Sequence, residues 1–228
     1  MNECMTQTEI GHPNINEFFH FDQRYLRNPN YNIGKGLCFG ISFCLLSHLI
    51  FKRHSDILCP EMSFNFARIY IDKLRHSFSH DDKSMYQYII KKQQRESQDD
   101  YLRLSENVSI NEQNGYGILS MVRIDNDNNR SSHPGYHYNS YKSQSNHVGV
   151  IVWDSSKLFI FEPNCGGLLY HSICGALNKE MFPQLVDSLI DNMYRRASRD
   201  GHSRIKEIHR PNNLRHYLTN VAVKTGLY

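Results

Sequence analysis

The stretch NIGKGLCFGISFCLLSHLIF, residues 32–51, decides how we interpret the fold. Its first five residues contain two glycines, which is typical of a turn. From residue 37 to residue 51, apolar side chains lie on nearly every side of a helical projection, interrupted by Ser42, Ser47 and His48. A helix that is apolar all round is buried within a fold. The stretch therefore predicts a turn that leads straight into a buried helix.

Cys38 follows this turn and opens the predicted helix. The start of a helix collects partial positive charge and free N–H groups, which favour the reactive thiolate form of a cysteine. The same N–H groups can hold the oxyanion of an acyl-transfer reaction, and Asn32 adds a side-chain donor. The alternative is that Cys38 is an ordinary buried residue. That interpretation suits Cys44 better, because it lies inside the helix, and we apply it also to Cys4 and Cys59.

Hydrophobic periodicity along the rest of the chain predicts an α+β protein. Helical spacing extends over residues 61–77, 83–93 and 181–196, and a short helix is expected near residues 16–25. Short apolar runs predict strands over residues 118–124, 148–153 and 158–161, with a last strand over residues 217–223. We expect a helical block packed on a mostly antiparallel sheet.

No linker rich in proline, glycine or serine divides the 228 residues. We therefore expect one main domain over residues 32–228, preceded by a partly irregular N-terminal extension over residues 1–31. The almost wholly polar segment 125–146 predicts a loop that is longer than most connections and is a candidate for gating a substrate.

The two apolar runs around residues 155 and 156 predict a β-hairpin. With the turn centred between those two residues, position 153 pairs with 158, 151 with 160, 149 with 162, and 147 with 164. Side chains alternate between the two faces of a hairpin, so His147, Glu162 and Asn164 share one face. Asn164 lies opposite His147, and Glu162 is its diagonal neighbour at about 7 Å.

A histidine held by a carboxylate or an amide is what a cysteine nucleophile requires, because the partner fixes the tautomer and favours the imidazolium. The pattern therefore predicts Cys38 as nucleophile, His147 as general base, and Glu162, helped by Asn164, as the group that orients the histidine. The alternative is that His147 and Glu162 are ordinary strand residues, since a one-residue change in loop length moves them to opposite faces.

Charge and cysteine content bear on whether the protein binds a nucleic acid and whether its thiols are oxidised. The net charge of +3 is a mild basic bias that does not by itself demand a nucleic acid. We interpret the crowding of basic residues near the C-terminus as a solvated surface, with a patch for an acidic partner or an anionic membrane surface as the alternative. Six cysteines without a C-x-x-C pair indicate reduced thiols. We expect neither a signal peptide nor a membrane span.

Three stretches resemble the YopT-type (AvrPphB-like) family of cysteine protease effectors: GLCFGIS at residues 36–42, His147 with the β-run after it, and FEPNCG at residues 161–166. The family pattern is a G-x-C-x-x-[LI]-S helix start, a histidine that opens a strand, and a Phe-Asp-Pro-Asn-x-Gly stretch after the next strand. The resemblance places the nucleophile on Cys38, the base on His147, the acid on Glu162, and an oxyanion donor near Asn32. The sequence departs from the pattern in carrying Glu162 where the family has aspartate.

The resemblance implies a papain-like fold and catalysis without a metal or cofactor. It also implies a protein substrate in a eukaryotic host cell, such as a small GTPase or a protein kinase. Family members are bacterial virulence proteins, which implies delivery by a specialised secretion system, type III, and action in the host cytosol. We expect a monomer that binds no nucleic acid.

Other functions use some of the same residues. A glutamine deamidase or a transglutaminase runs on the same triad, and the sequence does not separate these from a protease. A non-enzymatic binder is the alternative from another class. A zinc site built from His133, His137, His171 and Cys174 ranks lower, because structural zinc sites show closely spaced ligand pairs. A nucleic-acid binder lacks a matching motif.

Overall fold

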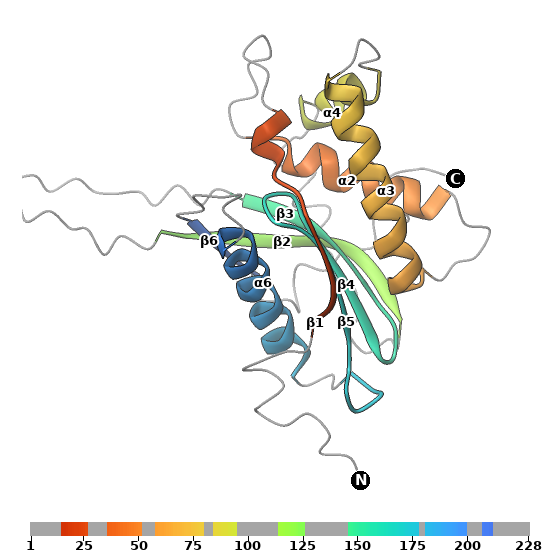
Figure 1. Cartoon of the computed structure of the whole chain (residues 1–228), viewed down its shortest axis with the longest axis vertical. Helices are drawn as coiled ribbons and strands as arrows, with labels where there is room; N and C mark the ends of the chain where they lie inside the picture. The colour runs from red at the N-terminus through yellow and green to blue at the C-terminus, as the bar shows by residue number, and fades with distance from the viewer. Residues whose placement is uncertain are drawn as a thin grey trace, which may run out of the picture.

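A computed structural model gives an α+β protein with one antiparallel sheet between helices (Figure 1). It describes residues 15–26, 36–51, 58–79, 84–94, 114–125, 146–177, 181–199 and 207–211. Within these residues six strands follow the order β1-β5-β4-β3-β2-β6, and every neighbouring pair is antiparallel. The strands are β1 (Ile15–His20), β2 (Gly115–Asp125), β3 (Asn146–Trp153), β4 (Lys157–Glu162), β5 (Gly166–His171) and β6 (Glu207–Pro211).

Helices cover both faces of the sheet. Helices α2 (Cys38–Phe51), α3 (Pro60–Ser79) and α4 (Ser84–Gln94) lie on one side, and α6 (Phe182–Arg199) lies on the other (Figure 1). Val150 and Phe161 belong to the core beneath α2, α3 and α4. Ile151 and Ile160 belong to a second core beneath α6. A sheet covered on both faces requires apolar side chains at successive strand positions, which explains the continuous apolar runs of β3 and β4.

Helix α2 is buried on almost every side. Ile41, Cys44, Leu45 and Leu46 are fully buried, and His48 is the one exposed side chain among residues 38–50. The helix packs between α4 and the sheet, with Ile89 of α4 in the same core. The prediction of a buried helix that begins at Cys38 is confirmed.

The other long periodic segments also form the predicted elements. Helices α3, α4 and α6 correspond to the helical spacing, and β2, β3 and β4 to the apolar runs. The hairpin has the predicted register near its turn, with Trp153 paired to Leu158 and Ile151 to Ile160, but the pairing stops at Val150 with Phe161. The predicted pair of positions 147 and 164 does not form, because β4 ends at Glu162 and Asn164 lies in the turn that follows. The observed register follows from the short turn, in which the Asp154 side chain accepts hydrogen bonds from the backbone N–H groups of residues 156 and 157.

The predicted helix near residues 16–25 is wrong. Ile15–His20 forms the edge strand β1, which pairs with β5, and a short 3₁₀ helix η1 (Gln23–Leu26) follows. Phe18 packs on the α6 side of the sheet and Phe19 on the opposite side, which is the two-residue alternation of a strand. Residues 15–26 therefore share the core with the main domain. The predicted boundary between residues 31 and 32 lies outside the described residues.

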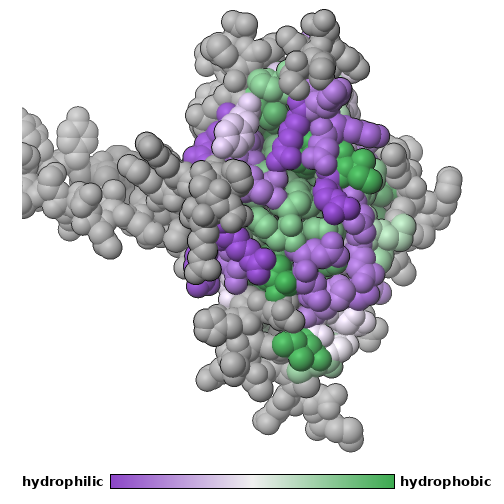
Figure 2. All heavy atoms as spheres, viewed as in Figure 1, coloured by the Kyte–Doolittle hydropathy of each residue, from purple (hydrophilic) through white to green (hydrophobic). Residues whose placement is uncertain are grey.

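Strands β5 and β6 were not among the predicted elements, and the strand expected over residues 217–223 lies outside the described residues. Hydrophilic residues cover much of the described surface in Figure 2, with apolar residues visible between them. None of the described helices has both the length and the apolar character needed to cross a membrane.

Candidate active site

Cys38 is the first residue of α2 and is 5% exposed. Gly36, two residues earlier, has a φ angle of +95°, a left-handed conformation that glycine adopts without strain. The chain reverses there and enters the helix, whose first turn closes with a 2.9 Å hydrogen bond from the Ile41 N–H to the Leu37 carbonyl. The Cys38 N–H belongs to the first turn and has no intrahelical acceptor. The thiol and this N–H thus lie together at the positive end of the helix dipole.

His147 lies at the start of β3 and is buried. Its Nε2 contacts Oε1 of Glu162, and the Cys38 side chain lies close enough to the ring to raise the pKa of His147. Because Nε2 faces the carboxylate, Nδ1 is the ring nitrogen left for the sulfur. The three side chains come from α2, β3 and β4, and the structure brings them together in the order Cys38, His147, Glu162.

The surroundings of His147 favour its protonated form. Burial lowers the pKa of His147, but the Glu162 carboxylate and the Cys38 side chain outweigh burial and raise this pKa from 6.5 to about 10. An imidazolium held by a carboxylate and placed beside a cysteine is the arrangement in which the histidine is a ready proton donor.

Glu162 ends β4 and is fully buried. Its Oε1 meets His147, and its Oε2 accepts a 2.9 Å hydrogen bond from the Asn164 N–H. The Cys165 thiol and the Tyr194 hydroxyl, from α6, also hydrogen-bond this carboxylate. Burial and then the Glu162 charge raise the pKa of both groups well above their ordinary values. A buried carboxylate is stable when its lone pairs are satisfied in this way.

Asn164 lies beside the pair but is a weaker partner of the histidine than predicted. The distance from its Nδ2 to Nε2 of His147 is 3.5 Å, at the outer limit of a hydrogen bond. A ring N–H that donates to Glu162 cannot also accept from an amide. The Asn164 side chain is instead engaged by Gln23 and Tyr194, the first through a 2.8 Å hydrogen bond.

Sequence reasoning missed Gln23 and Tyr194. Gln23 lies in the segment expected to be an irregular extension, and Tyr194 was interpreted as part of the apolar face of an amphipathic helix. Nothing in the periodicity distinguishes a buried tyrosine that only packs from one whose hydroxyl meets a carboxylate. The pairing of β1 with β5, which brings Gln23 to the site, links residues about 150 positions apart, and no local signal marks it.

Among the other cysteines that the structure describes, only Cys165 lies at the site. Burial raises the pKa of Cys44 to about 12, as expected for a structural thiol inside a helix. The thiols of Cys38, Cys44, Cys59 and Cys165 are free. Cys174 is disulfide-bonded, which corrects the expectation of reduced thiols for this residue.

Several predicted features lie outside the described residues. These are the proposed oxyanion donor Asn32, the cysteine Cys4, residues 126–145 of the polar loop, and the zinc candidates His133 and His137. Of the C-terminal basic residues, Arg204, Lys206 and Arg215 also lie there, whereas Arg195, Arg196 and Arg199 belong to α6 and Arg210 to β6. Within the described part of the chain no group of three metal-ligating side chains is present.

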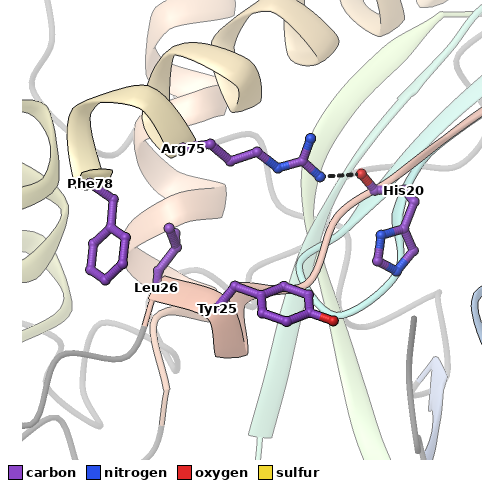
Figure 3. A pocket seen from close by; sticks show the side chains of 5 residues that line it. All are labelled: His20, Tyr25, Leu26, Arg75 and Phe78. Carbon is purple, nitrogen blue, oxygen red and sulfur yellow. Dashed lines mark hydrogen bonds between the residues drawn. The ribbon is translucent and has the colours of Figure 1, made fainter. Parts of the chain in front are cut away.

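A cavity of about 560 Å³ lies on the α3 side of η1 (Figure 3). Its lining includes Tyr25, Leu26 and Phe78, and the Arg75 guanidinium donates a 2.5 Å hydrogen bond to the His20 carbonyl across it. The triad residues do not line this cavity. This cavity is therefore separate from the site formed by Cys38, His147 and Glu162.

Comparisons with known proteins add little to this geometry. No family model and no curated protein matches the chain. Among solved structures, the crystal structure of the Pseudomonas avirulence protein AvrPphB is similar at 14% identity, over 78% of this chain and 92% of that chain. The TM-score is 0.24, too low to support a conclusion about fold or function.

Proposed function

We propose that this protein is a papain-like cysteine hydrolase with Cys38 as nucleophile, His147 as general acid and base, and Glu162 as the residue that orients the histidine. The proposal is carried by one observation: His147 is in contact with both Cys38 and Glu162. The three residues are separated by 109 and 15 positions in the chain, so their meeting is a product of the fold. The helix start at Cys38 supplies the N–H needed for an oxyanion.

In the first half of the reaction the Cys38 thiolate attacks a carbonyl carbon of the substrate, and a C–S bond forms while the carbonyl oxygen becomes an oxyanion. The Cys38 N–H stabilises this oxyanion, with the Asn32 amide as a second donor. The C–N bond then breaks, and the leaving amine takes the proton from Nδ1 of His147. A thioester on Cys38 remains.

In the second half neutral His147 accepts a proton from water at Nδ1, and the hydroxide attacks the thioester. The C–S bond breaks, the acid product leaves, and the thiolate and imidazolium are restored. Glu162 stabilises the imidazolium whenever it forms in the cycle and keeps Nδ1 directed at the sulfur.

For the substrate, we propose a protein of a eukaryotic host cell, of the small GTPase or protein kinase class, with the chain acting as a secreted virulence effector. The support for this finer proposal is the resemblance of residues 36–42 and 161–166 to the YopT-type pattern. A protease and a glutamine deamidase share the chemistry above and differ only in which amide reaches Cys38.

Alkylation with iodoacetamide followed by peptide mass spectrometry tests the nucleophile. We expect Cys38 to react faster than Cys59, although Cys59 is more exposed, because an activated thiolate reacts faster than an ordinary thiol. The variant His147→Ala should remove this preference while leaving Cys59 labelling unchanged. If Cys59 reacts first in the unaltered protein, the proposed function is wrong.

Incubation of the protein with a eukaryotic lysate tests the reaction. Cys38→Ala and His147→Ala should each abolish product formation while remaining folded by circular dichroism. New peptide termini identify a protease, and a one-dalton gain on glutamine identifies a deamidase. Product formation that survives Cys38→Ala would show that another group carries the chemistry and contradict the proposal.

A further inference from the structure

The side-chain amide of Gln23 joins the peptide before Cys38 to the turn after Glu162. Its Oε1 accepts a 2.7 Å hydrogen bond from the Leu37 N–H, in the peptide immediately before Cys38. Its Nε2 donates a 2.8 Å hydrogen bond to Oδ1 of Asn164, in the turn after Glu162. The Gln23 side chain is buried. One amide group therefore links the Leu37 peptide, directly before Cys38, to the turn at residues 163–165 that follows Glu162, which we call the acid turn.

The orientation of this amide is fixed by chemistry. A backbone N–H can only donate, so the atom of Gln23 that faces Leu37 must be the oxygen and the other must be the NH₂ group. The NH₂ group then requires an acceptor, which fixes Oδ1 of Asn164 toward it. The two side-chain amides thus set each other's orientation.

The backbone of Gln23 is also anchored to the acid turn. The Gln23 N–H donates to the Pro163 carbonyl at 2.8 Å, and the Phe21 N–H donates to the Cys165 carbonyl at 3.1 Å. Because these bonds fix the Gln23 main chain on the acid turn, its side chain holds Leu37 against the same turn. Movement of the Leu37 peptide away from the acid turn would break the buried hydrogen bond between Leu37 and Gln23, which costs free energy.

The same contacts extend to a closed circuit. The Asn164 amide donates to the Tyr194 hydroxyl, which in turn hydrogen-bonds Glu162. Glu162 contacts His147, His147 contacts Cys38, and Cys38 is covalently joined to Leu37, which donates to Gln23. Every residue of the circuit is buried or partly buried, and Leu37 takes part through its backbone N–H. Closed networks of this kind hold their members more rigidly than isolated pairs do.

We propose that Gln23 is a positioning residue that sets the separation between Cys38 and the His147–Glu162 pair by holding the Leu37 peptide against the Asn164 turn. This inference rests on the proposed cysteine hydrolase function and deepens it. Gln23 acts through Leu37 and Asn164, and it does not take part in proton transfer.

The test compares Gln23→Leu with Gln93→Leu. Gln93 is a matched control because it is a glutamine of α4 whose Oε1 also binds α2, accepting a 2.9 Å hydrogen bond from the Gly40 N–H. The measurement is the rate of Cys38 alkylation by iodoacetamide from pH 4 to pH 10. An ion-paired thiolate reacts even in mildly acidic solution, whereas an ordinary thiol reacts mainly above pH 8.

We expect Gln23→Leu to lose about tenfold or more of the alkylation rate at pH 6 and to move the inflection of the profile upward, as follows from displacing reacting groups by about 1 Å. Gln93→Leu should keep the profile of the unaltered protein. If Gln23→Leu does not fold, Gln23→Glu takes its place, since a carboxylate still accepts from Leu37 but cannot donate to Asn164, and the same upward move is expected.

An unchanged profile in a folded Gln23 variant overturns the positioning role, as does an equal change in Gln93→Leu. Both results are distinct from failure of the proposed function, which would appear as an ordinary thiol profile for Cys38 in the unaltered protein.

Discussion

The carboxylate of Glu162 is held on both oxygens, by His147 on one side and the Asn164 N–H on the other. Because the side chain is fully buried and ends a strand, its reach is set by its own length. The one extra methylene that distinguishes glutamate from aspartate is therefore used, and the departure from the YopT-type pattern that the sequence resembles is matched by the local geometry.

Glu162→Asp should reduce the reactivity of Cys38, even though aspartate stands at this position in the YopT-type pattern that the sequence resembles. The carboxylate withdraws by about 1.5 Å, one C–C bond, and cannot meet His147 and the Asn164 N–H together. We expect the Cys38 alkylation rate at pH 6 to fall by about tenfold to a hundredfold. Glu61→Asp is the control, because it shortens a carboxylate that pairs with Lys157, at the opposite end of β4 from Glu162. An aspartate variant as reactive as the unaltered protein would contradict this geometry.

His147 also makes stability depend on pH. Its pKa in the folded protein is about 10 and its ordinary value is 6.5. Between these values the His147 ring therefore holds a proton in the folded state that it has lost in the unfolded state. The stabilisation is fully present below about pH 6.5 and is lost as the pH rises to about 10. We expect the free energy of unfolding to fall by up to about 1.4 kcal/mol per pH unit in this window.

Urea unfolding at intervals from pH 6 to pH 10 measures this slope. Other groups titrate in the same range, so the quantity of interest is the difference between the unaltered protein and His147→Gln. The variant should show a flatter dependence on pH. Parallel curves for the two proteins would mean that His147 is not held as an imidazolium.

At the scale of elements, the sequence predicted those features that short-range interactions determine, such as turns and helix starts. The hairpin register follows from a short turn whose Asp154 side chain organises the backbone, so the shared face of His147 and Glu162 was predictable. The start of α2 followed from the glycine turn before Cys38. Strand β1 was not predictable, because its partner β5 is about 150 residues away and Phe18 and Phe19 fit a helix equally well.

Strand β5 has a stringent requirement at its first residue, directly after the turn from β4. Gly166 has a φ angle of +121°, and a Cβ there would lie 1.9 Å from the Phe19 carbonyl oxygen of β1. Gly166 therefore allows β1 to pair close beside the acid turn. Gly175 has a comparable φ angle of +71° but open space where its Cβ would lie.

Gly166→Ala should lower the free energy of unfolding by about 3 kcal/mol or more, since backbone strain and a steric clash add. Gly175→Ala carries the strain alone and should cost about 1 kcal/mol. Chemical denaturation of the two variants gives the comparison. Equal losses would show that β1 does not approach Gly166 as closely as described.

At the scale of the whole molecule, the site draws on both sides of the sheet. Cys38 comes from the layer of α2, α3 and α4, whereas Tyr194 comes from α6 on the opposite side (Figure 1). They meet through His147 and Glu162, where β3 begins and β4 ends. The sequence could not reveal this, because amphipathic spacing shows that Tyr194 faces the sheet but not which polar group lies beneath it.

Tyr194→Phe tests whether α6 supports the site. The change removes the hydroxyl that joins Asn164 to Glu162 and leaves the packing of the ring intact. Tyr86→Phe is the matched control, because Tyr86 is equally buried and donates a 2.6 Å hydrogen bond to the Leu26 carbonyl, away from the triad. Both variants should lose about 1–2 kcal/mol of stability. Only Tyr194→Phe should slow Cys38 alkylation at pH 6, by about tenfold, because only there does the lost hydroxyl bind the carboxylate that holds His147. Equal alkylation rates in the two variants would mean that α6 only covers the sheet and that the site is set by α2 and the hairpin alone.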